Sequence, residues 1–312
     1  MGKAKKTIPY IAKAIIGILF IISAIAKIVG MDKFEIYIYS YHFFSLNLSF
    51  IVARLAIIAE LVLGIGLLSM VLHKPVWWAS TLMTAGYTLF LLYAALTGRT
   101  DSCHCFGELV EMNPWQSIAK NAVLLAILAI AYFAKDVKWR FAWPTMIAVA
   151  IACGVTVFCV SPPDNFTPGY NREGNIDTKA LGELITTTPL DTLGLDTGKQ
   201  TLCFFTPGCE FCQLAARKIT LMQQYYGSNP DNLTYIFLMG DEESVNNFFE
   251  KSESERYRHI IYPDFKQLLA CIDGEFPTIA FLDNGKLVYQ CGLRDMHEDK
   301  VKAFFAHPQP AP

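Results

Sequence analysis

Two pairs of closely spaced cysteines have the spacing needed to exchange disulfide bonds. One pair is Cys103 and Cys105, which flank His104 in the stretch DSCHCFGE. The other pair is Cys209 and Cys212, in the stretch GCEFC. A thiolate attacks a disulfide to form a mixed disulfide, and a second thiol nearby then completes the exchange. The Cys-x-Cys pair would close a very small, strained ring, which is more easily reduced than an ordinary bridge.

The hydrophobic residues divide the chain into a membrane part and a soluble part. Of its 312 residues, 53% are hydrophobic and 17% are charged, and the net charge of −2 gives no sign of nucleic-acid binding. A membrane span needs about 20 mostly apolar residues. Residues 161–312 have the composition of an ordinary soluble domain. Five runs before them qualify as spans: 8–29, 48–70, 75–96, 115–133 and 141–160.

We expect the chain to consist of four parts. Residues 1–134 form a four-helix membrane domain, 135–160 hold a fifth transmembrane helix, 161–177 are a linker, and 178–312 form an α/β domain. The linker is rich in Pro, Gly and Asn. In the last part, strand-like and helix-like segments alternate, and a hairpin with an Asn-Gly turn and a final helix follow them. This order predicts a central mixed sheet.

The basic residues of the loops predict the orientation of the spans. They gather at the N-terminus, between the second and third runs, and between the fourth and fifth runs. The positive-inside rule then places the N-terminus in the cytoplasm and both cysteine pairs on the periplasmic side of a bacterial inner membrane. The first run also has features of a signal peptide, but it is long enough to remain as a span, and cleavage would not change the sidedness. The basic residues are Lys3, Lys5, Lys6, Lys13, His73, Lys74, Lys135, Lys138 and Arg140.

Cys209 and Cys212 follow an apolar strand and lie at the start of a helix. Backbone N–H groups and the positive end of the helix favour the thiolate of Cys209, which is the form that attacks a disulfide. Glu210 places a negative charge beside it, which raises its pKa and argues against a strongly oxidising site. Zinc sites use the same cysteine spacing, but they usually need a second pair of ligands, and the sequence has no second pair with that spacing. We therefore expect no metal.

The soluble part resembles a thioredoxin-fold domain. The resemblance rests on GCEFC after an apolar strand and on EFPTIAFLDNGKLVYQCG, and the longer insert from LTYIFLMG to HIIYPDF is similar to the TlpA-like branch. It covers roughly residues 178–307. The resemblance implies that Cys209 is the nucleophile and Cys212 the resolving thiol. It also implies a cis proline in the pair Pro277-Thr278, preceded by Phe276, whose backbone would bind an extended substrate.

Three further cysteines of the soluble part have open roles. Thioredoxins often have a buried acid in the strand before the motif, and Cys203 occupies that place here. The proton acceptor is therefore open, and the burial tendency of free cysteine favours a core role for Cys203. Cys271 and Cys291 either form a structural disulfide or are buried singly, since sequence does not fix connectivity.

The membrane part resembles the DoxX and MauE families of small four-helix membrane proteins. The resemblance rests on GILFIISAIAKIVGMDKF, which contains Lys27, on Glu60 in the second span, and on the motif CHCFGE. It covers roughly residues 8–134. MauE proteins act with a separate thioredoxin-like partner in making disulfide-rich periplasmic enzymes, and here the two parts are fused. The resemblance therefore implies disulfide exchange between the two cysteine pairs.

Ionisable residues inside the spans are costly and often functional. Lys27, Arg54 and Glu60 lie in or beside the first two spans. With His104 they are candidates for a membrane redox or proton site, and Glu60 is a candidate to line a site for a quinone, the only cofactor that we consider. Their alternative role is to pair with one another and orient the bundle, which we favour because intramembrane charges are commonly paired. Arg54 and Glu60 are about 9 Å apart along a helix and need not pair directly.

Together these features predict a membrane-anchored thiol–disulfide oxidoreductase that acts on cysteine-containing envelope proteins. The sequence leaves the direction open, although the lack of a cytoplasm-facing cysteine pair slightly favours oxidation. One alternative is a client-binding or assembly protein without turnover. Another is a DoxX-like, quinone-linked oxidoreductase of small sulfur compounds. For Cys103, His104 and Cys105, the alternatives are a metal site and a purely structural bridge.

Overall fold

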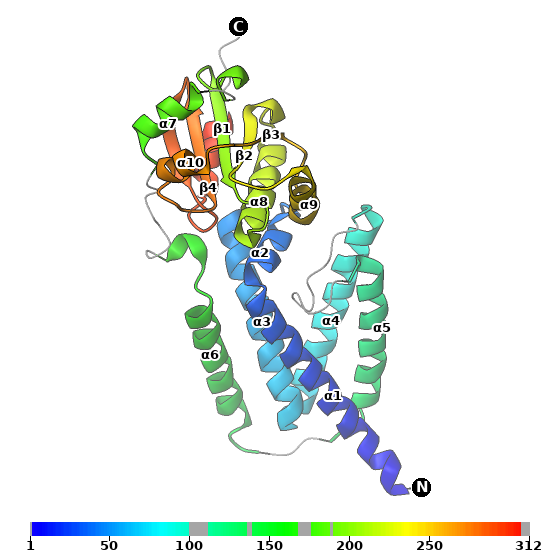
Figure 1. The fold of residues 1–312 in the computed structure, drawn as a ribbon. Coiled ribbons are helices and arrows are strands. Elements are labelled where there is room, and N and C mark those ends of the chain that lie inside the picture. The colour runs from blue at the N-terminus through cyan, green and yellow to red at the C-terminus, as the bar shows by residue number, and fades with distance from the viewer. Residues whose placement is uncertain (1, 100–111, 136–138, 168–175, 188–189, 307–312) are drawn as a thin grey trace. The chain divides into compact units, whose positions relative to one another are not determined.

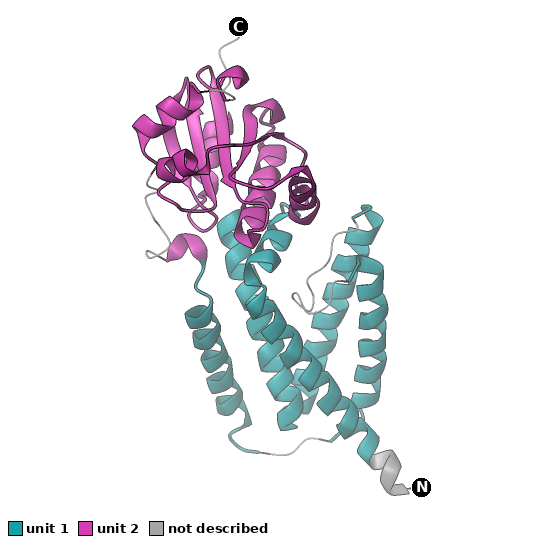
Figure 2. Cartoon of the chain, in the orientation of Figure 1, with its two compact units in different colours: residues 1–163 teal, residues 164–312 magenta. Residues whose placement is uncertain are grey.

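The structure is a computed structural model that describes residues 2–99, 112–135, 139–167, 176–187 and 190–306, with side chains from residue 7 onward (Figure 1). The chain divides into two compact units, residues 1–163 and 164–312 (Figure 2). The border between them falls inside the segment that we assigned to the linker. The expected fold class is confirmed, because the first unit is helical and the second combines helices with a sheet.

Six helices are described in the first unit, and five of them are long and apolar enough to cross a membrane. These five correspond to the five runs of the sequence, and the short α2 occupies the aromatic-rich segment between the first two. The bundle also has a close helix crossing, because a side chain at Gly17 or Gly64 would meet the backbone oxygen of the other at 2.9 Å. The helices are α1 (Gly2–Val29), α2 (Met31–Tyr39), α3 (Leu46–Ser69), α4 (His73–Leu96), α5 (Pro114–Ala131) and α6 (Ala142–Val160).

A buried arginine joins three helices of this unit. Arg54 on α3 is 1% exposed, forms an ion pair with Glu35 of α2, and donates through Nε to the carbonyl of Ser161 at 2.7 Å, just after α6. Its Nη1 also donates to the carbonyl of Phe50 at 2.8 Å. The charge of Arg54 is therefore neutralised by Glu35 and not by Glu60, which agrees with their separation along α3.

The second unit is built on a five-stranded mixed sheet with the order β3-β2-β1-β4-β5. The first three strands are parallel, and β4 runs antiparallel to both β1 and β5. The expected hairpin is present, because Asn284 and Gly285 both have positive φ, as a two-residue hairpin turn requires. The strands are β1 (Lys199–Phe205), β2 (Leu233–Phe237), β3 (Arg258–Ile261), β4 (Thr278–Asp283) and β5 (Lys286–Cys291).

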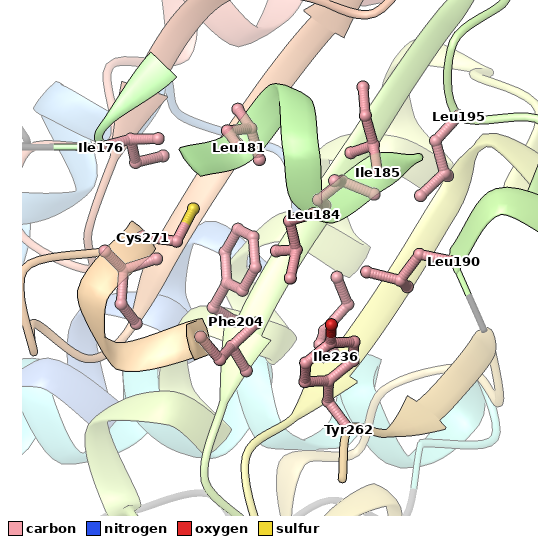
Figure 3. Close-up of a cluster of buried hydrophobic side chains, with 14 of the residues drawn as sticks. Ile176, Leu181, Leu184, Ile185, Leu190, Leu195, Phe204, Ile236, Tyr262 and Cys271 are labelled. Atoms are coloured by element: carbon pink, nitrogen blue, oxygen red, sulfur yellow. The ribbon is translucent and has the colours of Figure 1, made fainter. Parts of the chain in front are cut away.

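Helices cover both faces of the sheet. On one face, α7 (Thr178–Ile185) and α10 (Phe265–Cys271) pack on residues such as Phe204 and Ile236, and Figure 3 shows this core. On the other face, Tyr235 contacts α9 (Glu242–Ser252), Phe281 contacts α11 (Glu298–Ala306), and α8 (Glu210–Tyr226) lies between these helices. The central strand β1 is thus fixed from both sides, and it is the strand that leads into the cysteine motif.

Our sequence analysis missed the helix α7 and the short 3-10 turn Leu190–Leu193 that follows it. The signal for α7 was present. Asp177 caps the helix by accepting from two backbone N–H groups, and Leu181, Leu184 and Ile185 repeat at helical spacing and are buried.

Candidate active site

A tight turn between β1 and α8 positions the Cys-x-x-Cys motif. The N–H of Cys209 donates to the carbonyl of Thr206 at 3.0 Å, and Cys209 is the N-cap residue of α8. Gln213 supports the turn from inside the helix, because its side chain donates to the carbonyl of Pro207 at 3.1 Å. Cys209 is half-buried, whereas Cys212, one turn later, is fully buried. Only the first sulfur is therefore open to a substrate.

The two thiols differ strongly in acidity. A hydrogen bond from the thiol of Cys212 lowers the pKa of Cys209 to about 6, and backbone N–H groups of Cys212 and Phe211 act in the same direction. Burial and the charge of Glu210 oppose this shift without reversing it. The same sulfur–sulfur hydrogen bond, together with burial, raises the pKa of Cys212 far above its usual value. Cys209 is thus suited to attack a disulfide as a thiolate, whereas Cys212 stays protonated in the reduced protein.

The acidity of Cys209 should appear in its pH profile. Because the pKa is lowered to about 6, the thiolate is lost as the pH falls through 6 and is nearly complete above pH 7. We expect the rate of iodoacetamide modification of Cys209 in the reduced protein to fall at pH 5 to about a tenth of its plateau value. A rate that still climbs between pH 7 and 9, as for an ordinary thiol, would contradict this assignment.

The proline loop lies beside the motif. Thr278 pairs with Phe204 in the register of β4 and β1, so the residues just before it lie alongside the exit from β1 toward Cys209. The bond between Phe276 and Pro277 is cis, as the resemblance implied. Thr278 donates to the carbonyl of Glu275 at 2.8 Å, and the side chain of Phe276 packs against the core. The backbone of this loop therefore lies alongside the end of β1 that leads to Cys209, and its role in substrate binding stays a prediction.

The remaining cysteines of the second unit are buried singly. Cys203, Ile279 and Cys291 are register partners on one face of the sheet, whereas Cys271 belongs to the core on the opposite face. The sheet therefore separates Cys271 from Cys291, and both are free thiols. This excludes the structural disulfide between them that the sequence left open. Cys203 is fully buried and uncharged, as a core residue would be.

These differences in burial predict that an alkylating reagent will modify Cys209 selectively. Burial raises the pKa of Cys271 to about 12, and it raises the pKa values of Cys203 and Cys291 as well. In the native, reduced protein we expect iodoacetamide to modify Cys209 and to spare these three within the same time. Peptide mass spectrometry after brief labelling measures the modified fraction at each site, and labelling in denaturant serves as the control. Modification of Cys203 at the rate of Cys209 would contradict the buried placement.

The sequence analysis missed a buried lysine on α8 and a partly buried carboxylate near the proline loop, Lys218 and Asp295. Lys218 of α8 is 1% exposed and donates to the carbonyl of Leu293 at 2.8 Å. Asp295, whose pKa is raised by burial, accepts from the N–H of Gly292, and a side chain at Gly292 would lie 3.1 Å from the carbonyl of Pro277. These contacts support the segment after β5 against the loop. Lys218 lies three residues after Ala215 and four before Met222, so the helical spacing places it on the buried side of α8, but a charged residue is rarely expected in a core.

In the membrane unit, Lys27 and Glu60 form a buried ion pair between α1 and α3. Lys27 Nζ lies 2.5 Å and 2.7 Å from the two carboxylate oxygens of Glu60, and it donates to Ser23 at 2.9 Å. Both charged side chains are at least nine-tenths buried. The structure thus brings Lys27 and Glu60 together and places Arg54 in a separate pair. Cys103, His104 and Cys105 lie outside the described residues.

A family model matches the membrane unit, and a curated protein is similar to nearly the whole chain. Residues 5–134 match the model of the family described as methylamine utilisation protein MauE. The chain joins a MauE-like membrane domain to a thioredoxin-fold domain. Protein TlpB of Flavobacterium psychrophilum is 28% identical over 348 aligned positions, which cover 95% of this chain and 94% of that protein.

Among solved structures, a thioredoxin domain of a thiol–disulfide oxidoreductase from Bacteroides vulgatus is similar to part of the chain. The identity is 15%, and the match covers 36% of this chain and 81% of that one with a TM-score of 0.29. The thioredoxin-fold assignment therefore rests on the strand order, the cysteine turn at the start of α8, and the cis proline before β4. The MauE-like domain is the part that anchors this fold to a membrane.

Proposed function

We propose that the chain is a membrane-anchored thiol–disulfide oxidoreductase of a bacterial cell envelope. The observation that carries this proposal is the difference between Cys209 and Cys212. Cys209 is half-buried with a pKa lowered to about 6, and Cys212 lies fully buried behind it and donates a hydrogen bond to its sulfur. A nucleophile and a resolving thiol need these two environments.

The exchange balances without any further reactant. The thiolate of Cys209 attacks one sulfur of a client disulfide, which forms a mixed disulfide and releases the other client sulfur as a thiolate. The thiol of Cys212 then passes its proton to water and attacks the sulfur of Cys209, which breaks the mixed disulfide and releases the second client sulfur as a thiolate. The products are a Cys209–Cys212 disulfide and a reduced client, so two electrons have moved from the protein to the client. The same steps in reverse oxidise a client dithiol.

In this proposal, the pair Cys103 and Cys105 exchanges its disulfide with the pair Cys209 and Cys212, which we call the internal relay. Exchange between this pair and the Cys209–Cys212 pair moves the same two electrons between the MauE-like domain and the thioredoxin-fold domain. Because both pairs belong to one chain, their encounter has an effective concentration on the order of millimolar. The strain of a Cys-x-Cys ring favours its reduction by a thiolate.

The clients are cysteine-containing proteins on the outer side of the inner membrane. The loop charges support an N-terminus in the cytoplasm, and five spans then carry the thioredoxin-fold domain to the periplasm. Disulfides persist in that compartment, which is where an exchange enzyme has substrates.

A trapping experiment tests the proposal. In the full-length variant Cys212→Ser, the mixed disulfide on Cys209 cannot be resolved by its usual partner and accumulates. We expect non-reducing electrophoresis and peptide mass spectrometry of the membrane fraction to find Cys209 linked to Cys103 or Cys105 and to envelope proteins. The double variant with Cys209→Ala is the control, and the Cys271→Ser variant is a matched control for loss of a buried cysteine.

The outcomes separate the parts of the proposal. Capture of envelope proteins without Cys103 or Cys105 contradicts the internal relay and leaves the oxidoreductase in place. The absence of any capture that depends on Cys209 contradicts the enzyme and supports a client-binding protein without turnover.

A further inference from the structure

The MauE-like domain contains a cavity that the exchange reaction does not use. It is lined by α1, α3, α4 and α5, and the space not filled by protein atoms is about 540 Å³, including the open mouth. Its apolar wall is formed by Leu19 and Phe20 of α1 and Leu124 of α5. Its polar lining residues are Ser23, Lys27, Glu60, Thr84, Tyr87, Lys120 and Asn121.

Asn121 is the residue that points to a ligand. Its side chain lines this cavity, and the residue is only 4% exposed. Within the part of the chain that the structure describes, its amide has no hydrogen bond to the protein. The atoms of this amide are accessible from the cavity, so water or a ligand there can supply the hydrogen bonds that the protein does not. The amide can both donate and accept, so it suits a partner that offers oxygen atoms.

A charged group lines the same cavity. The ion pair of Lys27 and Glu60, with the hydroxyl of Ser23 bonded to both, lines it from the side of α1 and α3. The ammonium of Lys27 also lies 5.7 Å from the centre of the Tyr87 ring. The lining of the cavity therefore combines a buried ion pair with aliphatic and aromatic carbon.

The depth of the cavity restricts the ligand. Thr84 lies eleven residues after the start of α4, so it is about 16 Å from that end and close to the middle of the helix. The hydrocarbon core of a bilayer is about 30 Å thick, so a group at this depth is beyond the reach of lipid headgroups. Asn121 lies seven residues after the start of α5, about 10 Å from that end, so a ligand that reaches its amide from the bilayer must itself be soluble in the membrane.

We propose that this cavity binds the ring of a lipid-soluble quinone. The inference rests on the proposed function, because closing a disulfide from two thiols releases two electrons and two protons that need an acceptor. When bound, a quinone supplies that acceptor by taking up two electrons and two protons. A carbonyl oxygen of the quinone would accept from the Asn121 amide, a hydroxyl of the reduced form would donate to the oxygen of the same amide, and the Lys27–Glu60 ion pair lies in the same lining. The apolar wall packs against the ring.

The test measures binding and not turnover. The full-length protein in detergent is irradiated with a photoreactive azido-1,4-benzoquinone, with and without excess menaquinone-4, and the labelled peptides are identified by mass spectrometry. We expect labelling on α1 and α5 beside the lining residues, and menaquinone-4 to suppress it. In Asn121→Leu, which loses the amide but keeps a similar volume, we expect about tenfold weaker binding. In Ala122→Leu, on the exposed side of α5, we expect unchanged binding.

Two further measurements keep the result clear. Asn121→Gln restores an amide and should retain binding, and the melting temperature of each variant shows whether it is folded. Labelling elsewhere, labelling that menaquinone-4 does not suppress, or equal binding by the wild type and folded Asn121→Leu would overturn the site. If Asn121→Leu does not fold, the labelled positions in the wild type test the site: labels beside the lining residues support it, and labels elsewhere contradict it. Failure of the exchange reaction itself would appear as loss of glutathione disulfide reduction by Cys209, with quinone binding unaffected.

Discussion

The variant Cys209→Ser is expected to lose thiol–disulfide exchange, with the rate falling to that of the buffer alone. A serine hydroxyl is not ionised near neutral pH and cannot form a mixed disulfide, so neither the attack nor the ring closure remains. Among the cysteines described in the thioredoxin-fold domain, Cys209 alone combines partial exposure with a lowered pKa. The measurement is the reduction of glutathione disulfide or of a protein disulfide by the full-length, pre-reduced protein.

The matched control is Cys203→Ala, which removes a thiol from the strand that leads to the same motif. Cys203 is fully buried and its pKa is raised, so we expect this variant to keep most of its activity while losing some stability to the small cavity. Equal loss of activity in both variants would mean that Cys203 takes part in proton transfer. Activity that survives in Cys209→Ser would assign the nucleophile to another cysteine.

The second large effect is expected at the ion pair between α1 and α3. Removal of one partner by Glu60→Ala leaves the ammonium of Lys27 buried without its carboxylate. Breaking a buried pair in this way typically costs about 3–5 kcal/mol, because the remaining charge has lost its solvation and its partner. The measurement is unfolding of the full-length protein in detergent, followed by circular dichroism at 222 nm.

The informative comparison is the double variant Lys27→Met with Glu60→Leu. Replacing both charges with apolar side chains of similar volume is often neutral or stabilising, so we expect the double variant to regain most of the lost stability. Recovery would show that the penalty comes from the unpaired charge. A double variant that is as unstable as Glu60→Ala would instead assign a packing role to the Glu60 side chain itself.

The local motifs were predictable because each depends on residues close in sequence. The turn at Asn284-Gly285, the helix that starts after Cys209, and the five apolar runs all follow from short-range patterns. Sequence predicted that the charged residues of the spans would form ion pairs, but it did not predict all of the partners. Sequence indicated that Lys27, Arg54 and Glu60 would be paired, but not that Glu35 of the short helix α2 would be the partner of Arg54.

Contacts between distant elements were beyond sequence reasoning. Asn121 lies in an apolar run, where a polar residue is costly and often functional. Only the packing of four helices shows that it lines a cavity together with Glu60. Whether Cys271 and Cys291 can form a disulfide depends on which face of the sheet each one occupies. The register of β5 decides that, and the register follows from pairing with β4 and not from the cysteine spacing.

The three inert thiols on the two faces of the sheet have a consequence for biogenesis. With the periplasmic location proposed above, a newly translocated chain would expose every sulfur of this domain before its sheet forms, and wrong disulfides made at that stage would hinder later folding. After folding, Cys203, Cys271 and Cys291 are inaccessible to oxidants. Protection from non-native disulfides therefore depends on the folding rate, because the sheet must form before these cysteines are oxidised. Variants that fold slowly should accumulate molecules with non-native disulfides.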